Sequence, residues 1–150
     1  MPRRLFLAVS CLLALGVEER IFVSYGANDA GFHYLAHFFA GASAALLVMA
    51  VVAWRRGRPV RLPLLWIVLA HLFAMAPDFA FLDGSPHQHW MDIFLGHITI
   101  HFVPGANLTL LAAFAASLAV YLVVLDRQAA KAIRHWRASS PQSSIVATVL

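Results

Sequence analysis

Long apolar runs constrain this chain more than any other feature of its sequence. The clearest extends from Phe32 to Trp54, and a second extends from Leu62 to Leu82. A helix needs about 20 mostly apolar residues to cross the hydrocarbon core of a bilayer, and both runs are that long. Hydrophobic residues make up 61% of the chain and charged residues 12%, whereas soluble domains have about 25% charged residues. We therefore expect an integral membrane protein built from helices.

A third apolar stretch, from Ile93 to Leu125, is longer than one crossing needs. Pro104-Gly105 interrupts it, and proline ends or bends a helix because it lacks the backbone N–H. Non-helical backbone at membrane depth is tolerated only where protein or water covers it. We therefore predict an interfacial or re-entrant helix over about 92–103 and a full span over about 106–125.

The N-terminal segment has two interpretations. Arg3-Arg4 precede a short apolar run, which is typical of a secretory signal cleaved near residue 16. The favoured alternative is a retained span over about 5–25, with Glu18 and Glu19 at its water-exposed end. The predicted fold is then a single all-α transmembrane domain over 1–137, followed by a flexible cytoplasmic tail over 138–150. The four predicted spans cover about 5–25, 32–54, 62–82 and 106–125.

The basic residues predict the orientation of these spans. With the N-terminus inside, ten of the eleven lysine and arginine residues fall on inner segments, and only Arg20 falls outside. This distribution follows the positive-inside rule, so both chain ends are predicted in the cytoplasm, at a bacterial inner membrane. The net charge of +4 reflects this placement, and we find no motif for binding nucleic acid. Membrane lipids, a second copy or a partner membrane subunit are the expected partners.

Histidine residues collect on the outer side of this topology. Seven of the eight histidines and six of the seven acids fall at mid-membrane depth or further out. Two pairs, His33/His37 and His97/His101, have the four-residue spacing that places both rings on one helix face. The candidate metal ligands are His33, His37, His71, Asp78, His87, His89, His97 and His101. Of these, His33, His87 and His89, together with Asp92, are expected in an outer shell or at a second metal.

Asp78 is the polar residue whose position is most costly. It lies seven residues after His71, so both share one face of the predicted span. An ionised carboxylate at that depth is expensive and marks a functional candidate, and the sole basic residue on that side is Arg20. Imidazole and carboxylate gathered at one depth form a ligand set for a divalent transition metal, with zinc favoured. Isolated histidine pairs often occur without metal, so the prediction depends on several segments converging.

The order of these motifs resembles a known family. A histidine (His33 or His37) opens an early span, Ala76-Pro77-Asp78 ends an apolar helix, and His87-Gln88-His89 follows in a polar loop. This order is similar to that of the predicted membrane-bound metal-dependent hydrolases of bacteria and prophages. That family has Leu-Pro-Asp-x-Asp and His-Arg-x-x-Thr-His-Ser at these places. Here Ala80 replaces the second aspartate and the second signature is absent, so the resemblance implies metal-dependent hydrolysis without a substrate class.

Three functional hypotheses follow. The first is a metal-dependent hydrolase of a lipid-like substrate, with its site facing the periplasm and Asp78 as general base or ligand. The second is non-catalytic metal uptake, storage or sensing with the same ligands. The third is a b-type haem protein, or an accessory subunit of a membrane complex, because facing helices can supply axial histidines. The single cysteine, Cys11, excludes a disulfide framework and a cysteine-based zinc site.

Overall fold

The computed structural model describes residues 3–24, 30–82, 84, 86 and 88–139, with side chains placed except at 3–4, 21–24, 30–33 and 82. Within these ranges every regular element is a helix and no strand occurs, which confirms the predicted all-α class. The elements are α1 (Arg3–Ser24), α2 (Ala30–Arg56), α3 (Pro63–Leu82), η1 (His89–Ile93), α4 (His97–Ile100) and α5 (Ala106–Ser139).

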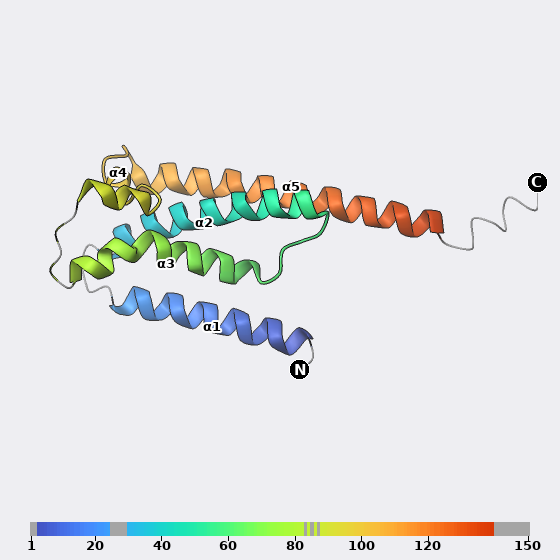
Figure 1. Cartoon of the computed structure of the whole chain (residues 1–150), viewed down its shortest axis with the longest axis horizontal. Coiled ribbons are helices and arrows are strands. Elements are labelled where there is room, and N and C mark those ends of the chain that lie inside the picture. Colours follow the sequence, from blue (N-terminus) through green and yellow to red (C-terminus); the bar gives the residue numbers. More distant parts are fainter. Residues whose placement is uncertain (1–2, 25–29, 83, 85, 87, 140–150) are drawn as a thin grey trace, which may run out of the picture.

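Helix α2 occupies the centre of the arrangement. It packs between α3 and α5, whereas α1 lies along α3 on the side away from α5 (Figure 1). The short helices η1 and α4 lie over the end of the bundle at which α2 begins and α3 ends (Figure 1). The C-terminal part of α5 extends beyond the other helices (Figure 1).

Three helices are long and apolar enough to cross a membrane, and they correspond to three of the four predicted spans. They cover Tyr34–Arg56, Pro63–Phe81 and Ala106–Ser139. Helix α1 occupies the range predicted for the first span, but its described residues are not among these three. Helix α5 begins at the predicted residue but continues past 125, because the alanines, glutamine, lysine and arginines that follow are good helix formers.

Small residues bring α2 and α5 together. Ala45, Ala50 and Ala53 on α2 are buried with Tyr121 of α5 in the main apolar core. Small side chains let two helix backbones approach closely, which increases van der Waals contact. At one end of this contact the Gln128 side-chain amide donates a 2.6 Å hydrogen bond to the Ala53 carbonyl oxygen. The α2–α5 pair is therefore held by packing along its length and by a polar bond at that end.

Gly41 sets the distance between α2 and α3. A Cβ atom at this position would lie 2.8 Å from the Cα and N atoms of His71 and from the Ala70 carbonyl oxygen. Real Cβ atoms essentially never come that close to backbone. Glycine at this position is therefore required for the observed helix separation, and that separation places the polar residues of the two helices within reach of one another.

We predict that Gly41→Ala lowers the stability of the bundle. The added methyl group forces the two backbones apart, and overpacking of this kind costs about 1–3 kcal/mol. The thermal midpoint of the detergent-purified protein, followed by circular dichroism, should fall. Gly16→Ala is the matched control, because a Cβ there meets nothing within 4 Å and alanine is the better helix former. Equal midpoints for Gly41→Ala and the unchanged protein would contradict the close approach.

The segment predicted as one helix over 92–103 is divided into η1 and α4. Leu95 and Gly96 lie between them with positive φ angles of 57° and 73°, which a right-handed helix does not allow. The Asp92 carboxylate compensates for this break. Its Oδ1 accepts hydrogen bonds from the backbone N–H groups of Ile98 (2.7 Å) and Thr99 (2.8 Å), and its Oδ2 accepts one from the Thr99 hydroxyl (2.9 Å).

Candidate metal centre

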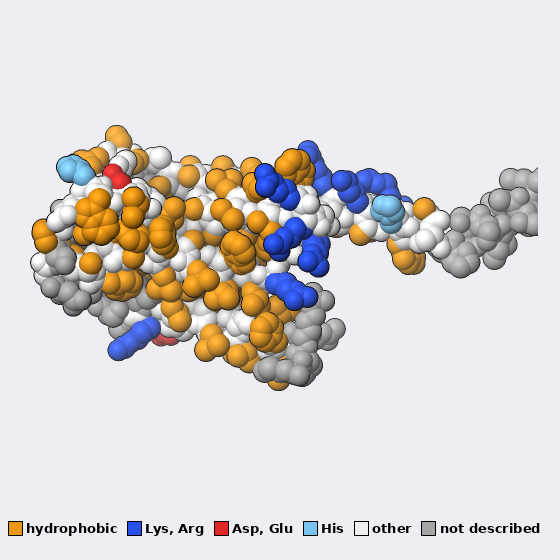
Figure 2. Space-filling model, in the orientation of Figure 1, with side chains coloured by type: hydrophobic (Ala, Val, Ile, Leu, Met, Phe, Trp, Pro, Cys, Tyr) orange, Lys and Arg blue, Asp and Glu red, His pale blue; other side chains and the backbone are white. Residues whose placement is uncertain are grey.

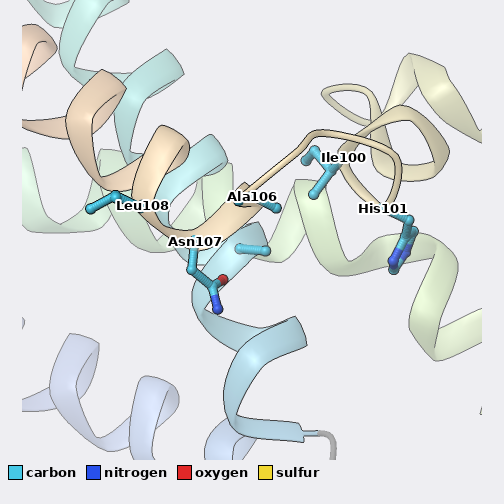
Figure 3. Close-up of a pocket in the computed structure, with 7 residues that line it drawn as sticks. Ile100, His101, Ala106, Asn107 and Leu108 are labelled. Atoms are coloured by element: carbon cyan, nitrogen blue, oxygen red, sulfur yellow. The ribbon is translucent and has the colours of Figure 1, made fainter.

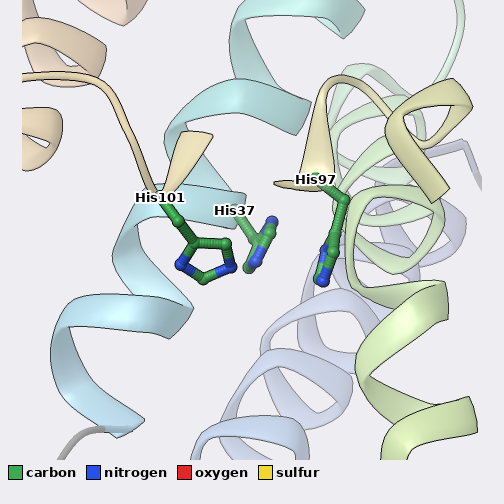
Figure 4. A group of neighbouring side chains, drawn as sticks. All are labelled: His37, His97 and His101. Atoms are coloured by element: carbon green, nitrogen blue, oxygen red, sulfur yellow. The ribbon is translucent and has the colours of Figure 1, made fainter. Parts of the chain in front are cut away.

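Three histidines from two helices and the turn after α4 converge at the end of the bundle. His37 belongs to the first half of α2, His97 opens α4, and His101 follows the last residue of α4. One ring nitrogen from each lies within 4.8 Å of the other two, which is close enough for a shared metal ion. Figure 4 shows the three rings turned toward a common space. The four-residue spacing of His97 and His101 therefore has the effect predicted from the sequence, on a much shorter helix.

Asp78 of α3 places a carboxylate beside two of these histidines, His37 and His97. Its Oδ2 lies 3.5 Å from His37 Nε2, and its Oδ1 lies 3.4 Å from His97 Nε2. Both distances are longer than those of ordinary N–H···O hydrogen bonds, which are about 2.7–3.2 Å between donor and acceptor. They match the edge of a zinc coordination tetrahedron, because ligands about 2.0–2.2 Å from the metal lie about 3.3–3.6 Å apart. A zinc ion bound by these atoms would therefore fit the spacing.

The site is buried on one side and open on the other. His37 and His97 are 0% exposed and Asp78 is 4% exposed, whereas His101 is exposed. The rings of His37 and His97 stack with centroids 4.5 Å apart, so two positive imidazolium rings would repel at this distance. An ionised carboxylate removed from water requires a compensating positive charge. A divalent cation shared by these groups would supply that charge while both stacked rings stay neutral.

A backbone contact orients one of the ligands. His97 Nδ1 lies 3.2 Å from the Ala74 carbonyl oxygen of α3. If the hydrogen is on Nδ1, this ring donates to the carbonyl, and the Nε2 lone pair then points toward Asp78. Histidine ligands in metal sites usually donate their second ring nitrogen to a carbonyl or carboxylate in this way, which fixes the ring.

Asp92 positions the short helix α4, which begins with His97 and is followed by His101. Its three hydrogen bonds tie η1 to the first turn of α4, at the break between Leu95 and Gly96. The bond from the Thr99 backbone N–H is the main reason that the pKa of the Asp92 carboxyl is held below its ordinary value. Asp92 thus holds the first turn of α4, and its role as an outer residue of a metal site stays a prediction.

We predict that Asp92→Ala weakens metal binding without removing a ligand. Losing the tie to α4 should lower metal affinity roughly 10-fold to 100-fold, the usual effect of losing an outer-shell partner. Competition with a chelator, read by elemental analysis, measures the affinity. Asp126→Ala, which removes an exposed carboxylate on α5, is the matched control and should leave the affinity unchanged.

The lowered pKa of Asp92 gives this contact a pH dependence. Because the folded-state pKa lies below the unfolded value of about 3.9, the stabilisation is complete above that pH and is lost as pH falls through the folded-state pKa. In metal-free protein, the amides of Ile98 and Thr99 should stay protected from hydrogen exchange until that lower pH. Loss of their protection well above pH 4 would contradict the assignment.

A second polar group lies between α1, α2 and α3. His71 of α3 is 0% exposed, and its Nδ1 lies 2.7 Å from Glu18 Oε2 of α1. The Tyr34 hydroxyl of α2 donates to the same carboxylate oxygen and also to the Glu18 backbone carbonyl oxygen at 3.3 Å. Most described leucines of α1 are exposed, and Ala14 is its one buried apolar residue among those described. The Glu18 carboxylate is therefore the main polar tie between α1 and the other helices.

The structure brings together four of the eight candidate ligands, namely His37, Asp78, His97 and His101. It places His71 in the separate group with Glu18 and Tyr34, although His71 and Asp78 share a helix as predicted. His89 lies exposed at the start of η1. The side chain of His33 and the whole of His87 lie outside the described residues.

Two polar residues that matter were missed at the sequence level. Glu18 was expected in water, and Tyr34 was not considered. Glu18 gave a signal in retrospect, because it is an acid that directly follows a long apolar run. Its partner could not be found from spacing, since Glu18 and His71 are separated by 53 residues.

A cavity of about 430 Å³ opens beside the three converging histidines. His101 forms one wall, and the start of α5 forms another (Figure 3). The other lining residues are mainly apolar or small, with Asn107 as a polar exception. They are Ala36, Ile100, Gly105, Ala106, Asn107 and Leu108. The exposed ligand of the site therefore faces a space suited to an apolar group.

No protein-family model, curated protein or solved structure matches this chain. The resemblance to membrane-bound metal-dependent hydrolases therefore stays a prediction carried by its motifs. The function has to be argued from the geometry of the site.

Proposed function

We propose that this protein is a metal-dependent hydrolase of the bacterial inner membrane that acts on a lipid-like substrate. The observation that carries the proposal is the convergence of His37, His97 and His101, one ring nitrogen of each lying within 4.8 Å of the other two, beside the buried Asp78 carboxylate. Zinc fits best, because imidazole and carboxylate at tetrahedral spacing are its usual ligands in proteins.

The proposed topology has α1, α2, α3 and α5 as four spans with both chain ends in the cytoplasm. Support comes from the charge distribution, because lysine and arginine side chains gather at the end of the bundle away from α4 (Figure 2). That end would face the cytoplasm by the positive-inside rule. The histidine group at the opposite end would then face the periplasm, near the outer surface of the membrane.

The residues of the site can be given roles in hydrolysis. His37, His97 and His101 would hold the metal, which polarises the scissile carbonyl or phosphoryl oxygen and makes water a better nucleophile. Asp78 is placed to accept the proton of the attacking water, as a general base. The cavity beside His101 would hold the apolar part of the substrate, with its ester near the one ligand that is exposed.

A non-catalytic metal-binding function is the second candidate, and one observation favours it. Asp78 lies at coordination-edge distance from two histidines, so it can itself be the fourth ligand. Structural zinc sites have four protein ligands, whereas catalytic sites keep one position for water. A haem site is less consistent with the geometry, because His37 and His97 stack face to face at 4.5 Å and leave no space for a macrocycle between them.

We predict that metal content depends on the histidines of the converging group and not on His71. Protein purified from metal-replete cells should carry about one equivalent of transition metal. His37→Ala and His97→Ala should each lose most of it, because removing one ligand opens a small shell. His71→Ala is the control of equal chemistry and equal burial, since its ring bonds Glu18 instead. Elemental analysis and an absorption spectrum give the result, and a metal-free unchanged protein would contradict the proposal.

Asp78→Asn separates the hydrolase from the metal-binding protein. The substitution keeps the volume of the side chain but removes its charge and its basicity. In a hydrolase the variant keeps much of its metal, yet turnover falls by roughly 10²–10⁴-fold, the usual contribution of a general base. In a binding protein the metal content itself falls, and there is no turnover to lose.

The measurement pairs metal stoichiometry with hydrolysis of a mixed extract of phospholipids and lipid esters. Asp126→Asn, on the exposed surface of α5, controls for the loss of one carboxylate. A fully metallated protein that leaves every lipid class intact would favour the binding function over the hydrolase.

A further inference from the structure

A second cavity lies at the opposite end of the bundle from the histidine group. Its volume is about 730 Å³, and it is formed between the start of α1 and the connection from α2 to α3. Phe6 and Leu7 line it from α1, and Arg58, Val60 and Arg61 line it from the connection. The cavity therefore joins an apolar wall to a pair of guanidinium groups.

The apolar wall is accessible from outside the bundle. Phe6 is 49% exposed and Leu7 is 39% exposed, and further exposed leucines continue along α1 toward Leu12 and Leu13. In a membrane such a surface contacts acyl chains. One acyl chain could therefore lie along α1 while its headgroup reaches the arginines.

The two arginines are available to an anion. Both side chains are exposed, and neither makes an ion pair or a hydrogen bond with another residue in the part of the chain that the structure describes. Two guanidinium groups can bind one phosphate through several charge-assisted hydrogen bonds. The connection that carries them is stiff, because Pro59 and Pro63 fix their own φ angles and Leu62 lies between them at a φ of 54°.

We propose that this cavity binds one anionic phospholipid, with its phosphate between Arg58 and Arg61 and an acyl chain on Phe6 and Leu7. Basic pockets between transmembrane helices on the cytoplasmic side suit such headgroups. The inference rests on the membrane insertion proposed above and is independent of the metal centre.

The other large basic cavity suits an anionic lipid less well. It measures about 710 Å³ and lies along α5, where Arg127, Lys131 and Arg134 line it together with Asp126. The Asp126 carboxylate would repel a phosphate and offsets part of the positive charge. Among the described residues, no acidic side chain lines the cavity beside α1, so a phosphate meets no competing carboxylate there, and the apolar wall adds a surface for an acyl chain.

The test compares two double variants of equal charge. Arg58→Gln/Arg61→Gln removes the proposed headgroup ligands, whereas Arg55→Gln/Arg56→Gln removes two exposed arginines from the end of α2 that line neither cavity. Delipidated protein in a neutral detergent is titrated with dioleoyl phosphatidylglycerol or dioleoyl phosphatidylcholine, and bound lipid is counted by native mass spectrometry. The unchanged protein should bind one phosphatidylglycerol in preference to phosphatidylcholine.

Loss of Arg58 and Arg61 should weaken phosphatidylglycerol binding by roughly 10-fold to 30-fold, and loss of Arg55 and Arg56 by less than about 3-fold. Circular dichroism confirms that each variant is folded. Equal losses in both double variants would overturn the proposal, because they indicate a diffuse surface charge instead of a site.

A further variant tests the apolar wall. Phe6→Ser should weaken phosphatidylglycerol binding but leave the binding of glycerol phosphate, which has no acyl chain, unchanged. Inorganic phosphate that displaces the lipid completely at low concentration would show an anion site without an acyl-chain site and would overturn the proposal. Carbonate extraction of membranes checks insertion separately. A protein that is inserted yet shows no preference for phosphatidylglycerol defeats this inference alone, whereas an extractable protein defeats the proposed function.

Discussion

The burial of the Asp78 carboxylate is the constraint on which the rest of this structure depends. A carboxylate withdrawn from water requires positive charge or hydrogen-bond donors at close range, and the helices bring the His37 and His97 rings within 3.5 and 3.4 Å of it. His37 can reach it because Gly41, one helical turn further along α2, lets α3 approach. His97 can reach it because the chain breaks at Leu95 and Gly96 and turns back over the bundle. Helix packing, loop geometry and the candidate chemistry are therefore parts of one arrangement.

Helix α2 contributes one polar residue to each of two polar groups. His37 faces the group formed with α3 and α4, whereas Tyr34, one turn earlier, faces Glu18 of α1 and the His71 ring. Phe38 contacts the His71 ring edge to face, on the side of Tyr34 away from His37. Two polar groups with different partners therefore lie one helical turn apart along α2.

The sequence predicted features that depend on neighbouring residues, such as the positions of helices. It did not predict contacts between residues that are far apart in the chain. The apolar runs predicted the positions of α2 and α3 because length and composition alone decide whether a segment can be a membrane helix. The four-residue spacing of His97 and His101 predicted neighbouring rings, and these rings lie 5.6 Å apart between centroids. By contrast, the tie between Glu18 and His71 depends on how α1 docks, which no local pattern encodes. The break at Leu95 was also unpredictable, because leucine rarely adopts a positive φ and does so here under the hydrogen bonds of Asp92.

The exposure of His101 has a consequence for the rate at which a bound metal ion would dissociate. The buried ligands His37 and Asp78 stand on long helices that move only with the bundle, whereas His101 follows a helix of four residues. Release of a bound ion would therefore begin with the departure of His101, and it would need the motion of a few residues at the surface. Such a centre would keep two ligands fixed on the bundle and one on the short segment between η1 and α5. The hold of that segment on His101 would then set the dissociation rate, and through it part of the affinity.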